Sequence, residues 1–372
     1  MIKVGITGQS GFLGTHLYNT LSLYSKRFIR IPFEDSYFEN TNKLISFVSG
    51  CDVIVHLAAV NRHNEQEFIY NTNITLVKKL IGALEHTDHC PHILYSSSIQ
   101  ENINNLYGKS KKEGRELLAK WAEKNTTAFT GFVFPNIFGP FGDPYYNSFI
   151  ATFSHQLTHG ETTNIDIDKT VPLLYVADTV KIILDAILNK LNKREFRINP
   201  SPERKVTDIL EILKTFKSIY FEKGTIPNLK DKFELNLFNT FRTYIDIKQH
   251  NPVKLQLNTD ERGSFIETVK TQLGGQFSFS TTKLGITRGN HFHIRKIERF
   301  TVIKGKAIIQ LRRIGTNEVL EFELDGNEPS FVDMPIWYTH NITNIGKEDL
   351  YTLFWVNEFF NPEDPDTYYE KV

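Results

Sequence analysis

Cysteine is scarce in this sequence, since Cys51 and Cys90 are the only two among 372 residues. Nothing in their spacing indicates a disulfide framework, which excludes a small secreted scaffold held together by disulfide bonds. Long apolar runs are missing too, because none approaches the roughly 18 residues of a membrane-spanning helix. The first residues, MIKVGITG, indicate a strand rather than a signal peptide. We therefore expect a cytoplasmic protein with reduced thiols and no membrane insertion.

An excess of charge of either sign is also missing, because 43 Lys and Arg balance 43 Asp and Glu. No long block of one sign occurs, so neither nucleic acid nor an anionic membrane surface is indicated as a partner. The length is greater than that of a usual single domain and predicts about two domains, each with its own core.

The segment MIKVGITGQSGFLGTHLYNTL indicates a buried strand, a glycine-rich turn and a helix with one apolar face. Gly8, Gly11 and Gly14 form the pattern G-x-x-G-x-x-G. Without side chains at these positions, backbone N–H groups can approach a pyrophosphate and the helix can pack closely on the strand. An ordinary tight turn shows the same pattern, so the glycines alone do not decide the function.

Two further apolar runs, CDVIVHLAAV (51–60) and HILYSSSIQ (92–100), are typical of buried parallel strands, and helical stretches lie between them. This alternation predicts a Rossmann-like, doubly wound α/β sheet. Tyr107 and Lys111 follow four residues apart, and hence on one helix face. The lysine charge is expected to lower the pKa of the phenol, which then delivers a proton to a carbonyl oxygen. A serine from Ser96 to Ser98 can hydrogen-bond the same oxygen.

Six short segments in order, TGQSGFLG, HLAA, YSSS, YGKSK, FPNIFGP and VPLLYVAD, resemble the extended short-chain dehydrogenase/reductase family, which acts on nucleotide sugars. The resemblance implies Ser98, Tyr107 and Lys111 as catalytic residues and Asn136 as a substrate contact. It also implies cofactor binding by Gly8, Gly11, Phe12, Leu13, Gly14, Leu57, Ala58, Ala59, Asn73 and Lys111. The end of the predicted second strand carries Arg30, with acidic residues only beyond a proline. This favours NADPH over NADH, because an arginine accommodates the 2′-phosphate, although a solvated strand-end charge would look the same.

The pattern changes near residue 245, where a polar stretch with a proline precedes alternating strands. We predict a reductase domain with a substrate subdomain over residues 1–245 and an all-β sandwich or jelly roll over 246–372. Within the second domain, Gly285, His291, His293, Glu298 and Gly305 fit G-x5-H-x-H-x4-E-x6-G. This spacing resembles the first motif of the cupin superfamily.

His291 and His293 face the same side of a strand, and Glu298 can return to them on the next strand. His340 lies in a segment that resembles the second cupin motif, although Trp337 replaces its glycine. We predict a divalent metal ion bound by His291, His293, Glu298 and His340. These ligands suit Zn, Fe, Mn or Ni, and Zn²⁺ is our first choice.

The segments TDERGSFIE and QFSFSTTKLGITRGNHF resemble the deoxysugar 3,5-epimerases, in which the histidine after an Arg-Gly pair removes a proton beside a ketone. That histidine is His291, so one residue is assigned both as base and as metal ligand, and a metal-bound nitrogen cannot take a proton. Tyr338 and Tyr351 are both candidates for the acid. Arg262, Arg288 and Lys296 are candidates for holding a diphosphate or the keto oxygen.

The order of the two halves resembles the CapF family of capsular polysaccharide assembling proteins. That resemblance implies C3 epimerisation of a UDP-4-keto-6-deoxy-N-acetylhexosamine in the cupin and then C4 reduction by NADPH. The implied product is UDP-2-acetamido-2,6-dideoxy-L-talose, for N-acetyl-L-fucosamine synthesis. Two alternatives stay open for the β half: a metal oxygenase, or a non-catalytic module that binds sugar or joins subunits. Cupin units commonly pair, which predicts a homodimer.

Overall fold

The chain forms two compact units, each described here by itself. The computed structural model describes residues 1–200, 203–260, 263–266, 268–272, 274–359 and 361–372. The first unit consists of Met1–Thr152 and Ile167–Val206, and the second of Phe153–Asp166 and Thr207–Val372. The boundary that we predict between residues 245 and 246 stays a prediction, and residues 207–245 lie in the second compact unit.

The first unit is built on a parallel sheet, which has six strands in the described residues, in the order β2-β1-β3-β4-β5-β9. The strands are β1 Ile2–Thr7, β2 Phe28–Ile31, β3 Val53–His56, β4 His92–Ser98, β5 Phe129–Phe134 and β9 Lys193–Arg197. After β2 the chain crosses back over β1 to add β3. The gap between the carboxyl ends of β1 and β3 is therefore the switch point where such sheets bind ligands.

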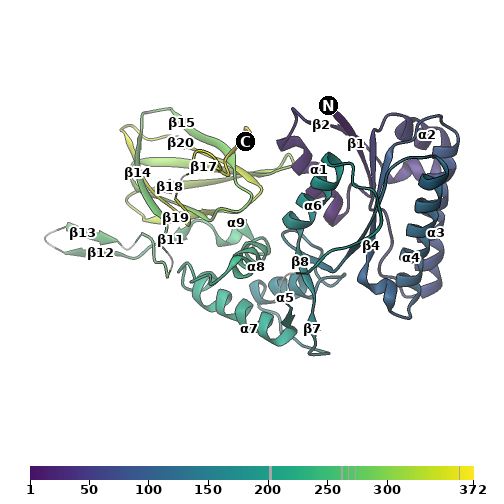
Figure 1. Ribbon diagram of the computed structural model, residues 1–372. Coiled ribbons are helices and arrows are strands. Elements are labelled where there is room, and N and C mark those ends of the chain that lie inside the picture. The colour runs from purple at the N-terminus through teal and green to yellow at the C-terminus, as the bar shows by residue number, and fades with distance from the viewer. Residues whose placement is uncertain (201–202, 261–262, 267, 273, 360) are drawn as a thin grey trace. The chain divides into compact units, whose positions relative to one another are not determined.

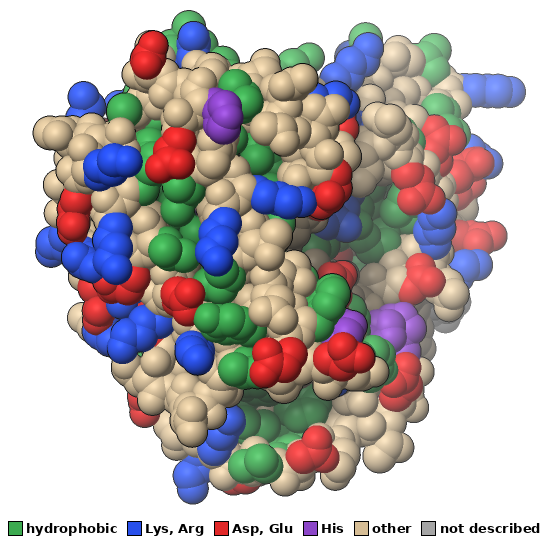
Figure 2. Space-filling view, turned by 90° about the vertical axis from the view of Figure 1, so that its right-hand side faces the viewer, with side chains coloured by type: hydrophobic (Ala, Val, Ile, Leu, Met, Phe, Trp, Pro, Cys, Tyr) green, Lys and Arg blue, Asp and Glu red, His purple; other side chains and the backbone are tan. Residues whose placement is uncertain are grey.

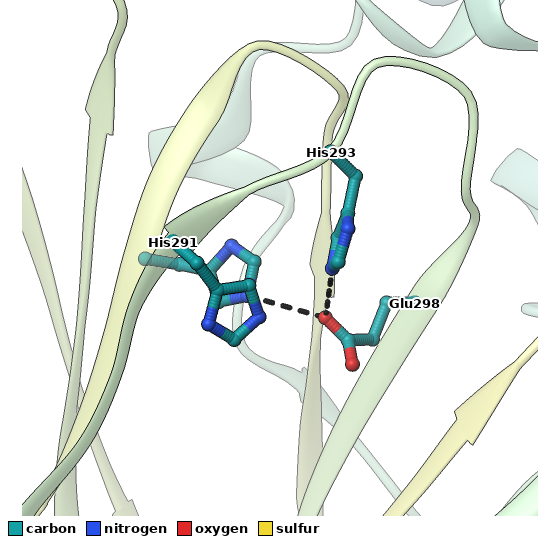
Figure 3. A group of neighbouring side chains, drawn as sticks. His291, His293 and Glu298 are labelled. Atoms are coloured by element: carbon teal, nitrogen blue, oxygen red, sulfur yellow. Dashed lines mark hydrogen bonds and ion pairs between the residues drawn. The ribbon is translucent and has the colours of Figure 1, made fainter. Parts of the chain in front are cut away.

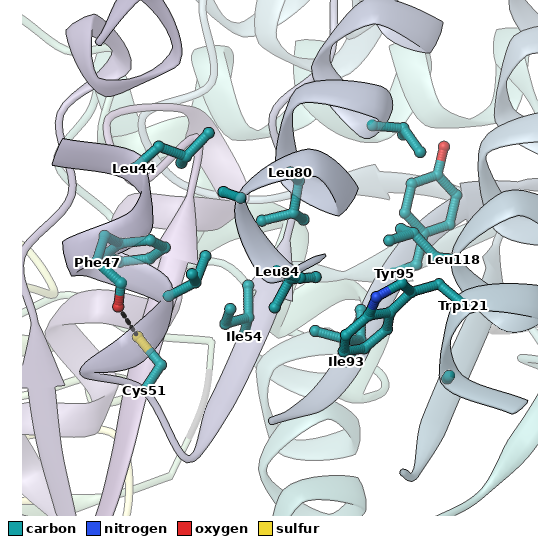
Figure 4. Packing of buried hydrophobic residues seen from close by; sticks show 14 of the residues in the cluster. Leu44, Phe47, Cys51, Ile54, Leu80, Leu84, Ile93, Tyr95, Leu118 and Trp121 are labelled. Carbon is teal, nitrogen blue, oxygen red and sulfur yellow. Dashed lines mark hydrogen bonds between the residues drawn. The ribbon is translucent and has the colours of Figure 1, made fainter. Parts of the chain in front are cut away.

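Helices cover both faces of this sheet (Figure 1). On one face lie α1 (Phe12–Leu23) and α6 (Val176–Leu188), and on the other α2 (Thr41–Ser49), α3 (Gln66–Glu85) and α4 (Leu106–Lys124). Figure 4 shows the apolar core between the sheet and α2, α3 and α4, in which Leu80 and Leu118 pack against Ile54 and Tyr95. A separate apolar cluster packs α1 and α6 on the opposite face. The predicted doubly wound α/β fold is confirmed.

Short elements complete the carboxyl edge of the first unit. Two 3₁₀ turns, η1 (Asp35–Glu39) and η2 (Ile99–Asn102), follow β2 and β4. Beyond β5, β6 (Asn136–Phe138) pairs with β8 (Leu173–Tyr175), and β7 (Thr170–Val171) pairs with β10 (Arg204–Lys205). Helix α5 (Phe149–Thr158) lies between β6 and β7 along the chain, and its residues from Phe153 onward belong to the second unit.

The second unit contains antiparallel sheets around an apolar core. Over its described residues, the main sheets run β11-β19-β16-β21-β14 and β18-β17-β20-β15-β22, and β12 and β13 form a separate hairpin. Their bounds are β11 Val253–Lys254, β12 Leu257–Asp260, β13 Gly263–Ile266, β14 Gln276–Thr282, β15 Thr287–Phe292, β16 Glu298–Lys304, β17 Lys306–Arg313, β18 Val319–Asp325, β19 Ser330–Met334, β20 Tyr338–Asn344, β21 Leu350–Val356 and β22 Tyr368–Tyr369. Val302, Ile309 and Ile342 lie in the core between the sheets. The predicted cupin jelly roll is confirmed.

A helical segment belongs to this second unit. It comprises α7 (Val206–Phe216), the π-helical turn η3 (Lys217–Phe221), α8 (Lys232–Arg242) and α9 (Ile247–His250). A buried ion pair joins it to the β structure, because Arg299 binds Asp333 through Nε (2.7 Å) and Nη2 (2.9 Å). The hydroxyl of Tyr220 donates to the same carboxylate (2.5 Å), and Arg299 donates to the Gly224 carbonyl oxygen (2.7 Å). These contacts explain why the helices are compact with the β half.

Candidate active site and candidate metal centre

The glycine-rich loop between β1 and α1 has no room for side chains. A Cβ on Gly14 would lie 2.1 Å from the Gly8 carbonyl oxygen, and one on Gly8 would lie 2.8 Å from the Ala58 Cα. Gly8 has a φ of 70°, in the left-handed region that favours glycine. The N–H of Gly11 donates to the Gly8 carbonyl oxygen (3.1 Å) and closes the turn. This cradle at the N-terminus of α1 fits the pyrophosphate of a dinucleotide.

A cavity of about 420 Å³ opens beside this loop. It is lined by residues that the sequence assigns to cofactor, catalysis and substrate: Gly8, Gly11, Phe12, Leu13, Gly14, Leu57, Ala59, Ser98, Tyr107, Lys111 and Asn136. Ala58 instead packs against Gly8. The structure therefore brings the predicted cofactor loop, the predicted catalytic residues and the predicted substrate contact to one cavity.

Asn73 is buried and is not among the described residues that line the cavity. Its side chain accepts a hydrogen bond from the Val60 N–H (2.7 Å) and donates to the Val60 carbonyl oxygen (2.9 Å) and to the Ser110 hydroxyl (3.0 Å). The residue is only 3% exposed. Asn73 thus fastens the loop after β3 to α4 and holds the predicted cofactor residues Leu57 to Ala59 in place.

Arg30 lies against α1. Its guanidinium is 4.3 Å from the ring centroid of Tyr18 and donates to the Tyr18 carbonyl oxygen (3.4 Å). Asp35, beyond the end of β2, accepts a hydrogen bond from Ser10 in the glycine-rich loop (3.1 Å). The structure therefore places a carboxylate next to that loop, and the predicted contact of Arg30 with a 2′-phosphate stays a prediction.

The predicted catalytic residues come from two adjacent elements. Tyr107 and Lys111 lie one turn apart on α4, and Ser98 is the last residue of β4. The Ser98 hydroxyl accepts a hydrogen bond from the Gln100 N–H (3.2 Å) at the start of η2. Helix α4 approaches η2 so closely that a Cβ on Gly108 would lie 2.0 Å from the Gln100 carbonyl oxygen. This contact fixes the distance between the strand end and the tyrosine helix.

Burial controls the proton affinities of this pair. It raises the pKa of Tyr107 to about 12, and the nearby Tyr146 phenol acts in the same direction. Burial also lowers the pKa of Lys111 to about 8, against the attraction of Glu101. The lowering of the Tyr107 pKa that the sequence predicts is therefore wrong for this structure, because burial disfavours the charged forms of both groups. Tyr107 keeps its proton at neutral pH and can donate it.

Sequence reasoning missed an ion pair that supports the corner between β4 and η2. Arg115 on α4 binds Glu101 through Nε (3.0 Å) and Nη2 (2.8 Å), and both side chains are nearly inaccessible to solvent. The Ser97 hydroxyl donates to the same carboxylate. The two charges are 14 residues apart, at no spacing that marks a motif. Their pairing depends on the tertiary contact of α4 with η2.

Sequence reasoning also missed a contact between two loops beside the cavity. Arg62, in the loop after β3, donates from Nη1 to the carbonyl oxygens of Tyr145 (2.5 Å) and Tyr146 (2.6 Å). Tyr145 has a φ of 61°, an unfavourable conformation for a tyrosine. Tyr146 lines the cavity, and its phenol influences Tyr107. Arg62 therefore fixes the backbone of a residue that lines the cavity.

In the second unit, the four predicted metal ligands form one cluster. His291 on β15 pairs in register with His340 on β20, and Glu298 begins β16. Their ligand atoms and that of His293 all lie within 4.8 Å of one another. Figure 3 shows His291, His293 and Glu298 directed toward a common point. The cluster offers imidazole nitrogens and a carboxylate oxygen, which suit Zn²⁺ and similar divalent ions.

The cluster fits a metal ion electronically as well as geometrically. Oε2 of Glu298 lies 3.1 Å from Nε2 of His293 and 3.2 Å from Nε2 of His340. The contact between Glu298 and His340 is short enough for an ion pair, but its angles are not those of a hydrogen bond. Among the described residues, the buried Nε2 of His340 therefore has no hydrogen-bond partner. Buried polar atoms without a partner are rare in proteins. A bound cation would satisfy this nitrogen.

Mutual contacts shift the pKa values in the cluster. Burial, together with the neighbouring His340, lowers the pKa of His291 to about 4, so His291 is neutral at pH 7. Burial alone would also lower the pKa of His293, but the hydrogen bond and charge of Glu298 raise it. Although burial opposes ionisation, contacts with His293 and His340 hold the pKa of Glu298 well below its ordinary value. The carboxylate is therefore charged over the physiological range.

The two candidate acids of the β half face different ways. Tyr338, His340 and Ile342 occupy every second position of β20. Both Tyr338 and Ile342 pack on the apolar core. Tyr338 is thus on the same strand face as His340. Tyr351 packs on Phe279, which is 57% exposed. The structure places Tyr338, and not Tyr351, on the ligand side of the jelly roll.

Two of the three predicted anion-binding residues belong to the part of the chain that the structure describes. Arg262 lies outside the described residues, and Arg288 is exposed on β15. Lys296 is buried, and its ammonium donates to the carbonyl oxygen of Pro365 (2.5 Å). Roles for Arg262 and Arg288 in binding substrate stay predictions. The ammonium of Lys296 instead binds the C-terminal segment.

The surface carries mixed charge. On the face shown in Figure 2, Lys and Arg side chains are interspersed with Asp and Glu side chains. This agrees with the equal numbers of basic and acidic residues in the sequence. Among the described residues, no helix has the length and apolar character needed to cross a membrane.

Both halves of the chain match known families. Residues 4–199 match the NAD dependent epimerase/dehydratase family, and residues 258–368 match the polysaccharide biosynthesis C-terminal domain. A UDP-2-acetamido-2,6-beta-L-arabino-hexul-4-ose reductase of Pseudomonas aeruginosa is 33% identical over 369 residues, which cover 99% of this chain and 98% of the relative.

Solved structures agree with this similarity. The capsular polysaccharide assembling protein CapF from Staphylococcus aureus is 33% identical, with all of both chains covered and a TM-score of 0.63. A UDP-N-acetylglucosamine 4-epimerase from Bacillus cereus is 20% identical over 59% of this chain and 82% of its own, with a TM-score of 0.52. The second match concerns the fold alone.

Proposed function

We propose, on the premise that this chain belongs to the NAD dependent epimerase/dehydratase family and to the CapF proteins, that it is a bifunctional nucleotide-sugar enzyme. The observation that carries the proposal is the presence of two sites on one chain. One is a dinucleotide cradle beside Ser98, Tyr107 and Lys111, and the other is a buried cluster of histidines and a glutamate. A 4-keto sugar needs both kinds of site, because its ketone acidifies C3 and is reduced at C4.

In the first unit we assign reduction of the C4 ketone. NADPH, when bound in the glycine cradle, supplies the hydride. Tyr107 donates its proton to the C4 oxygen as the negative charge develops, and Ser98 donates a hydrogen bond to the same atom. Lys111, one helical turn from Tyr107 and lining the same cavity, holds the ribose of the cofactor. We propose NADPH because a reductase consumes its cofactor in each turnover, and NADH is the alternative to be measured.

In the second unit we assign removal and return of the C3 proton. Zn²⁺, when bound to His291, His293, Glu298 and His340, supplies a positive charge that stabilises an enolate oxygen. If His291 is not held by the metal ion, its neutral imidazole takes the C3 proton, and Tyr338 on the ligand side of β20 returns one to the opposite face. If His291 is held as a ligand, another group is the base. The C3 inversion precedes reduction, which then traps the epimer.

The substrate and product follow from similarity. The Pseudomonas aeruginosa relative is described as a reductase of a UDP-linked 2-acetamido-hexul-4-ose, and the Staphylococcus aureus relative as a capsular polysaccharide assembling protein. We propose UDP-4-keto-6-deoxy-N-acetylhexosamine as the substrate and UDP-2-acetamido-2,6-dideoxy-L-talose as the product. The product serves N-acetyl-L-fucosamine synthesis for capsular polysaccharide in the cytoplasm.

The test supplies the 4-keto UDP sugar in deuterated water, with NADPH, with NADH or without either. We expect deuterium at C3 without a reduced cofactor, and faster oxidation of NADPH than of NADH. Cofactor oxidation without any exchange at C3 would instead support a reductase with a non-catalytic β half. Oxygen uptake would support a metal oxygenase.

Removal of the contact between Arg62 and the loop of Tyr146 tests substrate positioning. Arg62→Ala is expected to raise the KM for the nucleotide sugar about 10-fold, with a smaller change in kcat, because two charge-assisted hydrogen bonds that hold the loop of Tyr146 are lost. Steady-state reduction at saturating NADPH measures both constants. Arg27→Ala, at an exposed position before β2, is the control. A KM equal to that of the wild type would contradict the positioning role.

The homodimer stays a prediction. Phe277 and Phe279 are 52% and 57% exposed on β14, which is the edge strand of its sheet in the described residues. Exposed apolar side chains on an edge strand favour pairing with another chain.

A further inference from the structure

The C-terminal segment, residues 361–372, is bound tightly to the β half. Strand β22 pairs with β15, with Tyr369 opposite His291 and Tyr368 opposite Phe292. Arg312 forms an ion pair with Glu370 (3.0 Å), and the Glu370 N–H donates to the Asn290 carbonyl oxygen (3.0 Å). The segment thus lies directly beside the strand that carries the first metal ligand.

Asp366 is the most deeply buried acid of this segment, with 1% of its surface exposed. Its carboxylate accepts hydrogen bonds from the N–H groups of Ile294 (3.1 Å), Arg295 (3.0 Å) and Lys296 (3.0 Å). These three residues form the loop between His293 and Glu298. One carboxylate therefore organises the backbone that joins two of the ligands.

The backbone of Asp366 reaches a ligand directly. Its carbonyl oxygen receives a hydrogen bond from Nδ1 of His293. Because a carbonyl oxygen can only accept, the proton must be on Nδ1, and Nε2 is the nitrogen that can lose its proton. Nε2 is also the atom that lies 3.1 Å from Glu298, and Figure 3 shows the His293 ring directed at that carboxylate.

Asp366 has a φ of 41°, a conformation that is costly for most residues other than glycine. Asn and Asp tolerate it better than other residues do. The conformation directs both the carboxylate and the carbonyl oxygen of one residue toward the same loop. Strain of this kind persists where the surrounding structure requires it.

We propose that the C-terminal segment is part of the metal centre, and that Asp366 is a positioning residue that holds His293 in the tautomer and orientation needed to bind the metal ion. This inference rests on the proposed metal site. Hydrogen-bond partners of this kind fix the tautomer of metal-bound histidines. Their loss typically weakens metal binding about 10- to 100-fold. Asp366 and His293 are 73 residues apart, so no local motif joins them.

The test compares Zn²⁺ binding to the full-length wild type, Asp366→Asn and Asp364→Ala, by competition with a chromophoric chelator. Asn tolerates the backbone conformation of Asp366, but its amide NH₂ must face at least one N–H donor of the loop. We expect one Zn²⁺ per chain for all three proteins. Asp366→Asn is expected to bind about 10-fold or more weakly than the wild type.

Asp364→Ala is the matched control, since Asp364 lies in the same segment and binds Arg295 (3.0 Å) at a position 65% exposed. We expect its Zn²⁺ affinity to stay within about threefold of the wild type, as for most surface substitutions. Equal affinity of Asp366→Asn and the wild type would overturn the inference. A wild type that binds no Zn²⁺ would instead overturn the proposed metal site.

Hydrogen exchange of the wild type gives an answer that does not depend on a variant. Zn²⁺ is expected to slow amide exchange in peptides that cover 290–300 and 361–372, because binding at His293 and order in the segment are linked. Peptides from 313–319, in the turn between β17 and β18, should exchange equally with and without Zn²⁺. Unchanged exchange in 361–372 would contradict the coupling.

Discussion

Tyr107→Phe is expected to lower the rate of C4 reduction by about 100- to 10,000-fold, the range that general acid catalysis contributes. The change removes the hydroxyl that carries the proton and leaves the ring that fills the cavity wall. Hydrogen exchange at C3 is expected to continue at the wild-type rate, because the groups that we assign to it lie in the other unit. The variant therefore separates the two proposed reactions.

The measurement is single-turnover oxidation of NADPH with the 4-keto sugar, together with deuterium incorporation at C3 without NADPH. Tyr70→Phe is the control, because the Tyr70 hydroxyl donates to Glu113 (2.5 Å) and Tyr70 is not among the described residues that line the cavity. Reduction by Tyr107→Phe within a few-fold of the wild type would refute its role. Loss of C3 exchange in the same variant would refute the division between the sites.

Some residues of the reductase site could be predicted from spacing alone, because they are close together along the chain. Gly8 and Gly11 lie in the loop before α1, and Gly14 lies in the first turn of that helix. Tyr107 and Lys111 are one helical turn apart, so local geometry fixes the relation within each group. The pKa of Tyr107 could not be predicted, because it depends on burial by distant segments. The same is true of the bond from Arg62 to Tyr146, which spans 84 residues.

The metal cluster shows the same limit. The two-residue period of a strand places His291 and His293 together, and the resemblance to cupins adds Glu298 and His340. Asp366 carries no such signal, since it reaches the cluster through its backbone and through the N–H groups of a loop. The sequence predicts residues 207–245 as part of the first domain, and that boundary stays a prediction. The contacts of Arg299 and Asp333 with the segment of Tyr220 and Gly224 have no local signal in the sequence.

His291→Ala is expected to reduce C3 exchange by about 100-fold or more, whether His291 is the base or a metal ligand. His340→Ala distinguishes the two roles. If His291 is a ligand, both variants lose their bound Zn²⁺ and, with it, hydrogen exchange at C3. A chelator then has the same effect on the wild type. If His291 is the base, His291→Ala loses exchange while it keeps most of its Zn²⁺. Deuterium at C3 and metal content, measured on the same samples, decide between them.

His155→Ala is the control for loss of a histidine, because His155 lies outside the cluster, in the part of α5 that belongs to the second unit. Each variant should still bind NADPH, because the glycine cradle belongs to the first unit, and that binding shows that the first unit is folded. The neutral state of His291 suits both roles, since a pKa of about 4 leaves a nitrogen lone pair available at pH 7. Normal C3 exchange by His291→Ala would therefore remove the epimerase function from the β half, and its metal site would then serve binding or structure alone.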